Sequence, residues 1–159
     1  MKPRIEFRPI RPDDKPFLYR VFANTRPDIT GLNLGEKERA DLMWMQFRAQ
    51  HVDYQTRFSD ADFLIVNLER VAVGRLYVHR RADEIRIIDI ALLPERRGQG
   101  IGTQLMSDIM HEAQQIGKPV RIHVEQFNRA LGWYERLGFV RVGDIQTHYL
   151  MEWRPRRSI

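Results

Sequence analysis

The sequence predicts a mixed α/β fold in which helices cover both faces of one central sheet. Three observations lead to this prediction. Apolar residues alternate along the chain between the two-residue period of strands and the 3.6-residue period of helices. The 159 residues, 43% of them hydrophobic and 30% charged, are enough for one domain with its own core. No linker, repeat or low-complexity stretch interrupts the chain, so we expect a single domain over residues 1–159.

The first half of the chain has the signals of a strand, two helices and a hairpin. Acidic Asp13 and Asp14 are typical of a first helical turn, because negative charge is favoured at a helix N-terminus. Glu69 and Arg70 separate two strand-like runs, which indicates a hairpin. In order, we expect a strand over 5–10, a helix over 13–24, a loop over 25–35, a helix over 36–58, and strands over 63–68 and 71–78.

The second half alternates strands and helices and closes with two adjacent strands. Pro94 ends the strand that begins at Ile85. Gly117 and Pro119 end a helix with one apolar face, formed by Leu105, Met106, Ile109, Met110, Ala113 and Ile116. We expect strands over 85–93, 120–125, 139–145 and 148–153, and helices over 103–116 and 130–137.

Composition excludes several classes of protein. Cysteine is absent, so disulfides, thiolate metal sites and a cysteine nucleophile are excluded together. No apolar run has the roughly 20 residues of a membrane span, and Met1–Arg8 lacks the apolar core of a signal peptide, so we expect a cytoplasmic protein without a membrane partner. The net charge of +5 comes from basic residues spread along the chain. This favours an ordinary solvated surface over nucleic-acid binding. His123 and Glu125 share a strand face, but two residues are not a metal site, and none is expected.

The most informative segment is the glycine-rich stretch Pro94–Gly102, with the sequence PERRGQGIG, between a predicted strand and a predicted helix. Its three glycines allow backbone conformations with positive φ and close approach of a ligand. The unpaired amides at the start of the following helix, together with the helix dipole, favour an anion there. Arg96 and Arg97 can add charge-assisted hydrogen bonds. The stretch therefore predicts a phosphate or pyrophosphate site.

Two common phosphate loops fit this stretch poorly. A nucleotide-triphosphate loop needs a lysine after its last glycine, and Ile101–Thr103 does not supply one. A dinucleotide fingerprint has the spacing G-x-G-x-x-G, but here the third glycine comes one residue early and position 103 is threonine. Glu125 stands where such a site would keep an acid to bind the ribose. However, the 34 residues after it are too few for the rest of a doubly wound sheet.

The motif RGQGIG over Arg97–Gly102 resembles the pyrophosphate loop of the GNAT superfamily of acyl-CoA-dependent N-acetyltransferases. Asp89–Pro94, with the sequence DIALLP, resembles the strand that leads into that loop. Asn128–Ala130 and Trp133–Phe139 resemble the second signature of the family, an asparagine and an alanine followed by a tyrosine and then Gly-Phe. The resemblance covers 85–140 well and the first 80 residues only in element order. It implies the GNAT fold, with neighbouring strands splayed apart at the cofactor site.

The resemblance also implies how acetyl-CoA is bound. In the family, the backbone of the strand before the loop pairs with the pantetheine arm, which would fall here to Ile90 and Leu92. The amides of Arg97–Gly102 would hold the pyrophosphate, and Asn128 would touch the cofactor farther along. The full implied set of cofactor contacts is Ile90, Ala91, Leu92, Arg96, Arg97, Gly98, Gln99, Gly100, Ile101, Gly102, Thr103, Asn128 and Tyr134.

The implied reaction moves an acetyl group from acetyl-CoA to a primary amine of a small molecule or peptide. Tyr134 is the candidate acid that protonates the departing thiolate. Asp89 and Glu125 are both candidates for the base, and the residues leave open which one serves. Trp44, Met45, Phe47 and Tyr54 form a stripe on the predicted helix over 36–58, which is either core packing or the wall of an acceptor pocket. A noncatalytic acyl-CoA-binding module and a dinucleotide-binding domain are the alternatives, and homodimer formation stays open.

Overall fold

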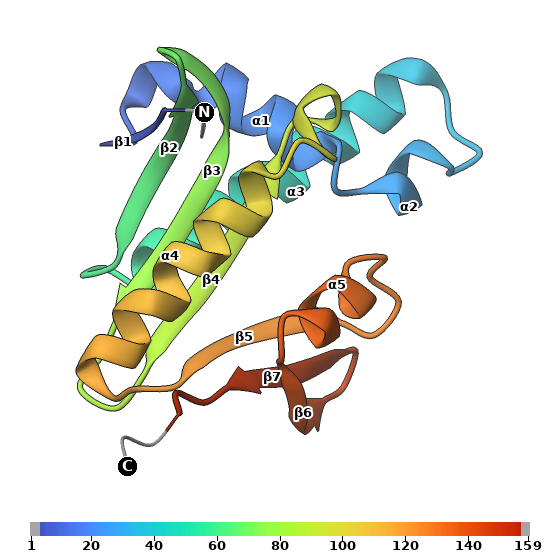
Figure 1. Cartoon of the computed structure of the whole chain (residues 1–159). Coiled ribbons are helices and arrows are strands. Elements are labelled where there is room, and N and C mark those ends of the chain that lie inside the picture. Colours follow the sequence, from blue (N-terminus) through green and yellow to red (C-terminus); the bar gives the residue numbers. More distant parts are fainter. Residues whose placement is uncertain (1–3, 157–159) are drawn as a thin grey trace. The chain divides into compact units, whose positions relative to one another are not determined.

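The computed structural model describes residues 4–156 and contains a mixed α/β fold (Figure 1). Seven strands form one sheet in the order β1-β2-β3-β4-β5-β7-β6. They are β1 (Ile5–Pro9), β2 (Asp62–Leu68), β3 (Val71–Arg80), β4 (Ile85–Leu92), β5 (Val120–Glu125), β6 (Val140–Ile145) and β7 (His148–Trp153). The helices are α1 (Lys15–Ala23), α2 (Pro27–Thr30), α3 (Glu36–Arg57), α4 (Ile101–Ile116) and α5 (Leu131–Arg136). The fold class predicted from the sequence is confirmed.

The bounds of the elements differ from the prediction by more than one residue in four places, one of which is α4, which begins at Ile101 rather than at residue 103. The loop expected over 25–35 contains the single turn α2, which starts at Pro27 because proline at a first helical position leaves no amide unpaired. The helix expected to begin at Asp13 is preceded by a 3₁₀ turn, Pro12–Asp14. β3 continues two residues beyond the expected end, to Arg80.

The chain forms two compact units. The first contains the chain up to Tyr77 together with Asp89–Gly102, and the second contains Val78–Ile88 together with the chain from Thr103 onward. The prediction of a single domain over residues 1–159 stays a prediction, since β3 and β4 contribute residues to both units.

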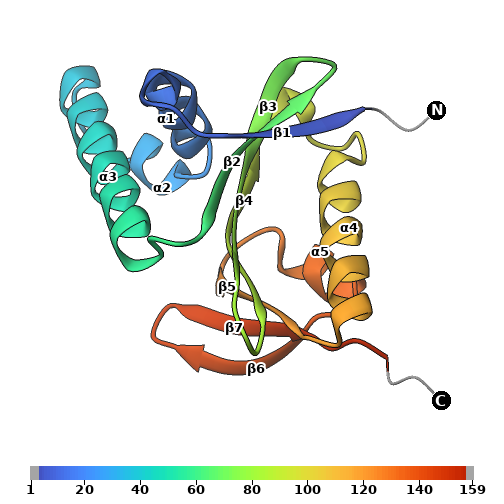
Figure 2. The same ribbon diagram turned by 90° about the vertical axis from the view of Figure 1, so that its left-hand side faces the viewer.

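The helices of the first unit are held together by aromatic side chains. α1 and α2 both contact α3, and the three lie beside one another in Figure 2. Phe22 and Phe47 are buried and lie 5.7 Å apart between ring centroids, and Tyr19 meets Phe47 edge to face at 5.8 Å. Helix α3 is therefore fixed by its contacts with α1 through one buried aromatic face. In the sheet, β1 pairs with β2 in antiparallel register from Ile5↔Leu68 to Pro9↔Leu64.

The second unit has the apolar core that the pattern on α4 predicts. Leu105, Met106, Ile109 and Ala113 are buried, whereas Ile116 at the last turn is exposed. β5 pairs with β7 over six residues, and β6 follows β7 with an irregularity between Arg141 and Gly143. In Figure 1 these three strands lie side by side, with α5 next to them.

The parallel pairing of β4 with β5 is short. It covers Ile85↔Val120, Arg86↔Arg121 and Ile87↔Ile122. β4 continues to Leu92 and β5 to Glu125. β4 ends at Leu92, three residues after Asp89, and the glycine-rich stretch begins at Pro94.

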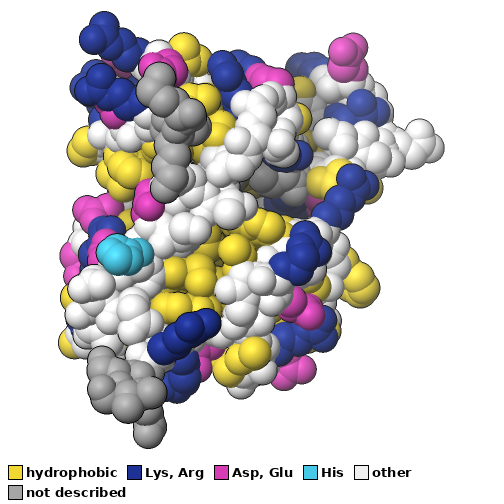
Figure 3. Space-filling view, in the orientation of Figure 1, with side chains coloured by type: hydrophobic (Ala, Val, Ile, Leu, Met, Phe, Trp, Pro, Cys, Tyr) yellow, Lys and Arg dark blue, Asp and Glu magenta, His cyan; other side chains and the backbone are white. Residues whose placement is uncertain are grey.

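Many arginines take part in ion pairs. In the second unit the carboxylate of Glu152 is 2.7 Å from Nε of Arg121 and 2.5 Å from Nε of Arg154, and Glu84 lies 3.2 Å from Arg86. On the face drawn in Figure 3, basic side chains are interspersed with acidic ones. Within residues 4–156 no helix is both long and apolar enough to span a bilayer.

Candidate functional site

The glycine-rich stretch forms an open turn between β4 and α4. Gly98 and Gly100 have φ of +73° and +82°, in the left-handed region that favours glycine, and no atom lies within 4 Å of where their β-carbons would be. Among the described residues, no hydrogen-bond acceptor is found for the backbone amides of Gly98, Gln99 and Gly100. The first amides of α4 add further donors that have no partner within the helix. The turn thus offers a group of unpaired N–H donors beside open space, which is what an anion requires.

Arg97 anchors this turn. Its guanidinium donates to the carbonyl of Leu92 at 3.3 Å and lies 3.5 Å from that of Asn24, and its amide donates to the carbonyl of Pro94. Gln99 donates from its side chain to the carbonyl of Glu95 at 3.0 Å. Arg96, by contrast, has no side-chain partner among the described residues. Of the two arginines, Arg97 is thus the one that holds the turn together.

The end of β4 is packed against β3. Ile90, Ala91 and Leu92 are half-buried, and the amide of Leu93 donates to the carbonyl of Val73 at 2.9 Å. This segment is therefore neither fully buried nor fully exposed.

Asp89 belongs to a buried polar cluster. One carboxylate oxygen of Asp89 accepts from Nη2 of Arg75 at 2.7 Å, and the same Nη2 lies 3.0 Å from the side-chain oxygen of Gln50. Burial, and the negative charge of Asp89, raise the pKa of Tyr54 far above the ordinary value of a phenol. Burial likewise raises the pKa of Tyr77 to about 12. Both phenols therefore stay protonated at neutral pH.

Tyr134 lies on α5 in the second unit and is 5% exposed. Its ring centroid is 4.9 Å from that of Trp133 and 5.8 Å from that of Phe139, which it meets edge to face. The amide of Phe139 donates back to the carbonyl of Tyr134 at 3.1 Å. The Gly-Phe that follows the tyrosine in the sequence therefore helps to fix the ring.

Asn128 and Glu125 lie in the same unit as Tyr134. The side-chain oxygen of Asn128 accepts from the amide of Ala130 at 2.7 Å, just before α5 begins. Glu125 is exposed, and Nε2 of His148 lies 4.0 Å from its carboxylate. The hydroxyl of Thr103 is 3.3 Å from the indole nitrogen of Trp133. The predicted site residues thus fall into two groups: Asp89, Ile90–Leu92 and Arg96–Gly102 in the first unit, and Thr103, Glu125, Asn128 and Tyr134 in the second.

A family model described as an acetyltransferase (GNAT) domain matches residues 59–141, slightly more than half of the chain. The chain belongs to the GNAT acetyltransferase family. The matched residues include Asp89, the glycine-rich turn and Tyr134, whereas α1, α2 and α3 lie before them. Membership of this family indicates that the general activity of the protein is acyl transfer.

Solved structures of GNAT proteins share the fold at low sequence identity. PaiA N-acetyltransferase from Thermoplasma acidophilum, solved with coenzyme A, is 17% identical, with a TM-score of 0.69 over 95% of this chain and 99% of that one. An acetyltransferase from Thermus thermophilus is 21% identical, with a TM-score of 0.65 over 96% and 97% of the two chains. The ribosomal-protein-S18-alanine N-acetyltransferase of Escherichia coli is 16% identical, with a TM-score of 0.63 over 98% and 96%. No curated protein matches the sequence.

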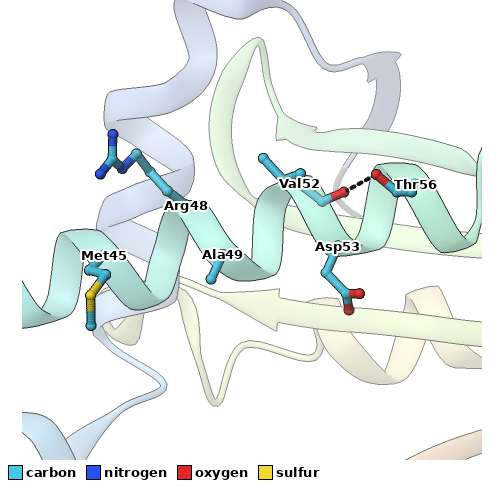
Figure 4. Close-up of a pocket in the computed structure, with 6 residues that line it drawn as sticks. All are labelled: Met45, Arg48, Ala49, Val52, Asp53 and Thr56. Atoms are coloured by element: carbon cyan, nitrogen blue, oxygen red, sulfur yellow. Dashed lines mark hydrogen bonds between the residues drawn. The ribbon is translucent and has the colours of Figure 1, made fainter.

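The four aromatic and apolar residues predicted to wall an acceptor pocket do not form one wall. Phe47 is in the core and Trp44 packs on Tyr19, with ring centroids 5.0 Å apart. Met45 and Tyr54 line two different surface depressions of this GNAT protein. Figure 4 shows the depression with Met45, in which Met45, Ala49 and Asp53 point to one side of α3. The prediction of one shared wall is wrong, because helical spacing placed Phe47 on the inner face of α3.

Arg75 and Gln50 are the residues around Asp89 that sequence reasoning missed. Arg75 interrupts an apolar run on β3, and a charged residue at that place in a central strand is the signal that could have found it. Gln50 carries no comparable signal, since glutamine is common on any helix. Within residues 4–156, no three His, Asp or Glu side chains lie close enough together to bind a metal ion.

Proposed function

We propose that this GNAT protein is an N-acetyltransferase that moves the acetyl group of acetyl-CoA to a primary amine. The observation that carries the proposal is the turn over Arg97–Gly102, where left-handed Gly98 and Gly100 leave a run of backbone amides unpaired at the start of α4. Such a turn suits a pyrophosphate, because donors and the helix dipole both favour negative charge.

The rest of acetyl-CoA would be held by residues on either side of that turn. Arg96 would add charge to the pyrophosphate site, since its guanidinium is available. The backbone of Ile90–Leu92 would pair with the amides of the pantetheine arm. Thr103 and Asn128 complete the proposed contacts. The side-chain oxygen of Asn128 accepts from the amide of Ala130 just before α5, and its side-chain nitrogen has no partner among the described residues.

In the proposed reaction the amine nitrogen attacks the thioester carbon and a tetrahedral intermediate forms. The carbon–sulfur bond then breaks, and the departing thiolate takes a proton from the hydroxyl of Tyr134. A phenol ordinarily has a pKa near ~10 and a thiol near ~8.5, so this transfer is close to balanced. Its fixed ring suits Tyr134 to the task, because a proton donor must be held within hydrogen-bond reach of the sulfur.

The amine must lose a proton before it can attack. The carboxylate of Asp89 is already bound by Arg75, whereas that of Glu125 is exposed and, among the described residues, has only the 4.0 Å contact with His148. Of the two predicted candidates, Glu125 is therefore the better base, acting directly or through a water molecule.

Thermal unfolding tests the proposal. Acetyl-CoA at ~100 times its Kd should add about 2.7 kcal/mol of stability, if the unfolded chain does not bind it. For a chain of this length that corresponds to a Tm increase of roughly 5–11 °C. NAD and ATP at equal concentrations should do much less, and a larger shift with NAD would overturn the proposal. Amine acceptors would then be screened by following release of free CoA.

A further inference from the structure

β6 is an edge strand with an exposed apolar surface. In the part of the chain that the structure describes, it pairs with β7 on one side and with no strand on the other (Figure 1). All of its residues are exposed, among them Val140 at 58%, Val142 at 48% and Ile145 at 59%. Edge strands present unpaired backbone donors and acceptors, which proteins often protect with lysine or proline. β6 contains neither, so its edge is open to another strand.

A bulge in β6 brings its two charged side chains to the same face of the sheet. Arg141 pairs with Met151, and Asp144 pairs with Tyr149. Met151 and Tyr149 are two residues apart on β7 and point the same way, so Arg141 and Asp144 share that face. In a regular strand, residues three apart lie on opposite faces. The irregularity between Arg141 and Gly143 adds the extra residue that changes this.

The apolar ends of β6 share the other face. Val140 and Ile145 pair with Glu152 and His148, which are four residues apart on β7 and therefore point the same way. The strand is thus symmetric about its midpoint in a chemical sense. One face carries an apolar residue on each side of the midpoint, and the other face carries a positive and a negative residue.

We propose that two copies of this chain associate through β6, with the two strands antiparallel about a two-fold axis perpendicular to the sheet. Such an axis brings each residue of one copy to its counterpart across the midpoint of the other, so every contact is made twice. Arg141 then lies opposite Asp144 of the second copy, and Val140 lies opposite Ile145. Each meets its counterpart on its own face of the sheet. Opposite charges and apolar pairs both stabilise neighbouring antiparallel strands.

The charged groups of β6 are available for this contact. Among the described residues, no ion-pair partner is found for Asp144. Arg141 lies 3.2 Å from Glu135 in a half-exposed ion pair, and its guanidinium lies over the ring of Tyr149, 4.3 Å from the centroid. A guanidinium has five N–H donors, so Arg141 can bind a second carboxylate without releasing the first.

The wild-type protein tests the association directly. A pairing of two six-residue strands is smaller than the roughly 1,200–2,000 Å² of stable interfaces, so we expect a dimer at about 1 mM that dissociates on dilution to about 1 µM. Analytical ultracentrifugation measures the Kd of this dimer. Hydrogen exchange of the β6 amides should slow as the protein concentration rises, because the dimer buries them. A protein that stays monomeric at about 1 mM would overturn the proposal, as would a dimer in which exchange at β6 is unchanged.

Charge reversal tests the register. Arg141→Asp places carboxylates opposite one another, and Asp144→Arg places guanidinium groups opposite one another, so each variant should raise the Kd of the dimer at least about tenfold. An equimolar mixture of the two variants should form a mixed dimer, because every reversed residue then meets an opposite charge. The double variant Arg141→Asp/Asp144→Arg should associate like the wild type. Asp108→Arg, the same change at an exposed position of α4, should have no effect on the Kd.

Urea denaturation shows whether each variant is folded. Single variants that associate like the wild type would overturn the proposal, and so would a mixture of folded variants that stays monomeric. The result is separate from the proposed function, because none of the proposed cofactor contacts lies on β6. Acetyl-CoA should therefore raise the Tm of Arg141→Asp as much as that of the wild type. A protein that dimerises through β6 but does not bind acetyl-CoA would contradict the proposed function alone.

Discussion

Gly74 on β3 lies against the backbone of Ala91 on β4. A β-carbon at Gly74 would be 2.3 Å from the carbonyl oxygen of Ala91 and 2.8 Å from Cδ2 of Leu92. Both distances are shorter than van der Waals contact allows, so only glycine fits this place without a shift of the neighbouring strand. Glycine therefore lets β3 approach the segment of β4 that we propose to face the pantetheine arm.

Gly74→Ala should destabilise the protein by about 1–3 kcal/mol or more, because the clash is with backbone rather than with a flexible side chain. Gly143→Ala on β6 is the matched control, since its β-carbon would lie 3.9 Å from that of Leu150, an ordinary contact. Urea denaturation measures the free energy of unfolding of both variants. Equal stabilities for the two variants would show that β3 and β4 do not approach as described.

Gly100→Val should abolish the Tm increase produced by acetyl-CoA. At φ +82° a β-branched side chain is strained, and it would also fill the open space beside the unpaired amides. Gly117→Val is the control: Gly117 follows the other end of α4, has φ +69° and has equally open surroundings. Thermal scans should show both variants destabilised, but only Gly117→Val should respond to acetyl-CoA. A normal response from Gly100→Val would remove the turn from the binding site.

Tyr134→Phe should lower kcat by roughly 10²–10⁴, or about 3–5 kcal/mol of transition-state stabilisation. The ring contacts with Trp133 and Phe139 remain, so the Kd of acetyl-CoA should stay within about twofold. Tyr149→Phe removes a phenol from β7 in the same unit and should keep its turnover. If kcat of Tyr134→Phe equals that of the wild type, Tyr134 is a packed aromatic and not the acid.

Asp14→Asn should destabilise the protein by about 1–3 kcal/mol near pH 7. Arg8 donates to both carboxylate oxygens, at 2.7 and 2.8 Å, and these hydrogen bonds lower the pKa of Asp14 below its ordinary 3.8 although burial opposes them. The stabilisation is therefore complete above the unfolded value and is lost as pH falls through the lower folded value.

Urea denaturation at about pH 7 and about pH 2 tests this, and the difference between wild type and Asp14→Asn should shrink or vanish in acid. Asp41→Asn, in an exposed pair with Lys37 at 3.7 Å, should have little effect at either pH. A difference that persists unchanged in acid would mean that Asp14 contributes through shape rather than charge.

Local signals were sufficient for most elements of the fold. The apolar face on α4, the turn at Glu69 and Arg70, and the prolines and glycines that end segments predict where strands and helices lie. The short helix α2 was missed because a single turn has no periodicity to detect. Its one signal is Pro27.

The sequence by itself determined the fold class, the glycine-rich turn over Arg97–Gly102 and the position of Tyr134 on a short helix, because each depends on residues that are close along the chain. Only the tertiary structure shows which side chains surround Asp89. Arg75 lies 14 residues before it, and Gln50 lies 25 residues before Arg75. Such partners come into contact only when separate strands and a helix pack together. A local sequence pattern does not indicate contacts between residues that are far apart along the chain. For the same reason only the packed structure shows that Arg97 anchors its own turn.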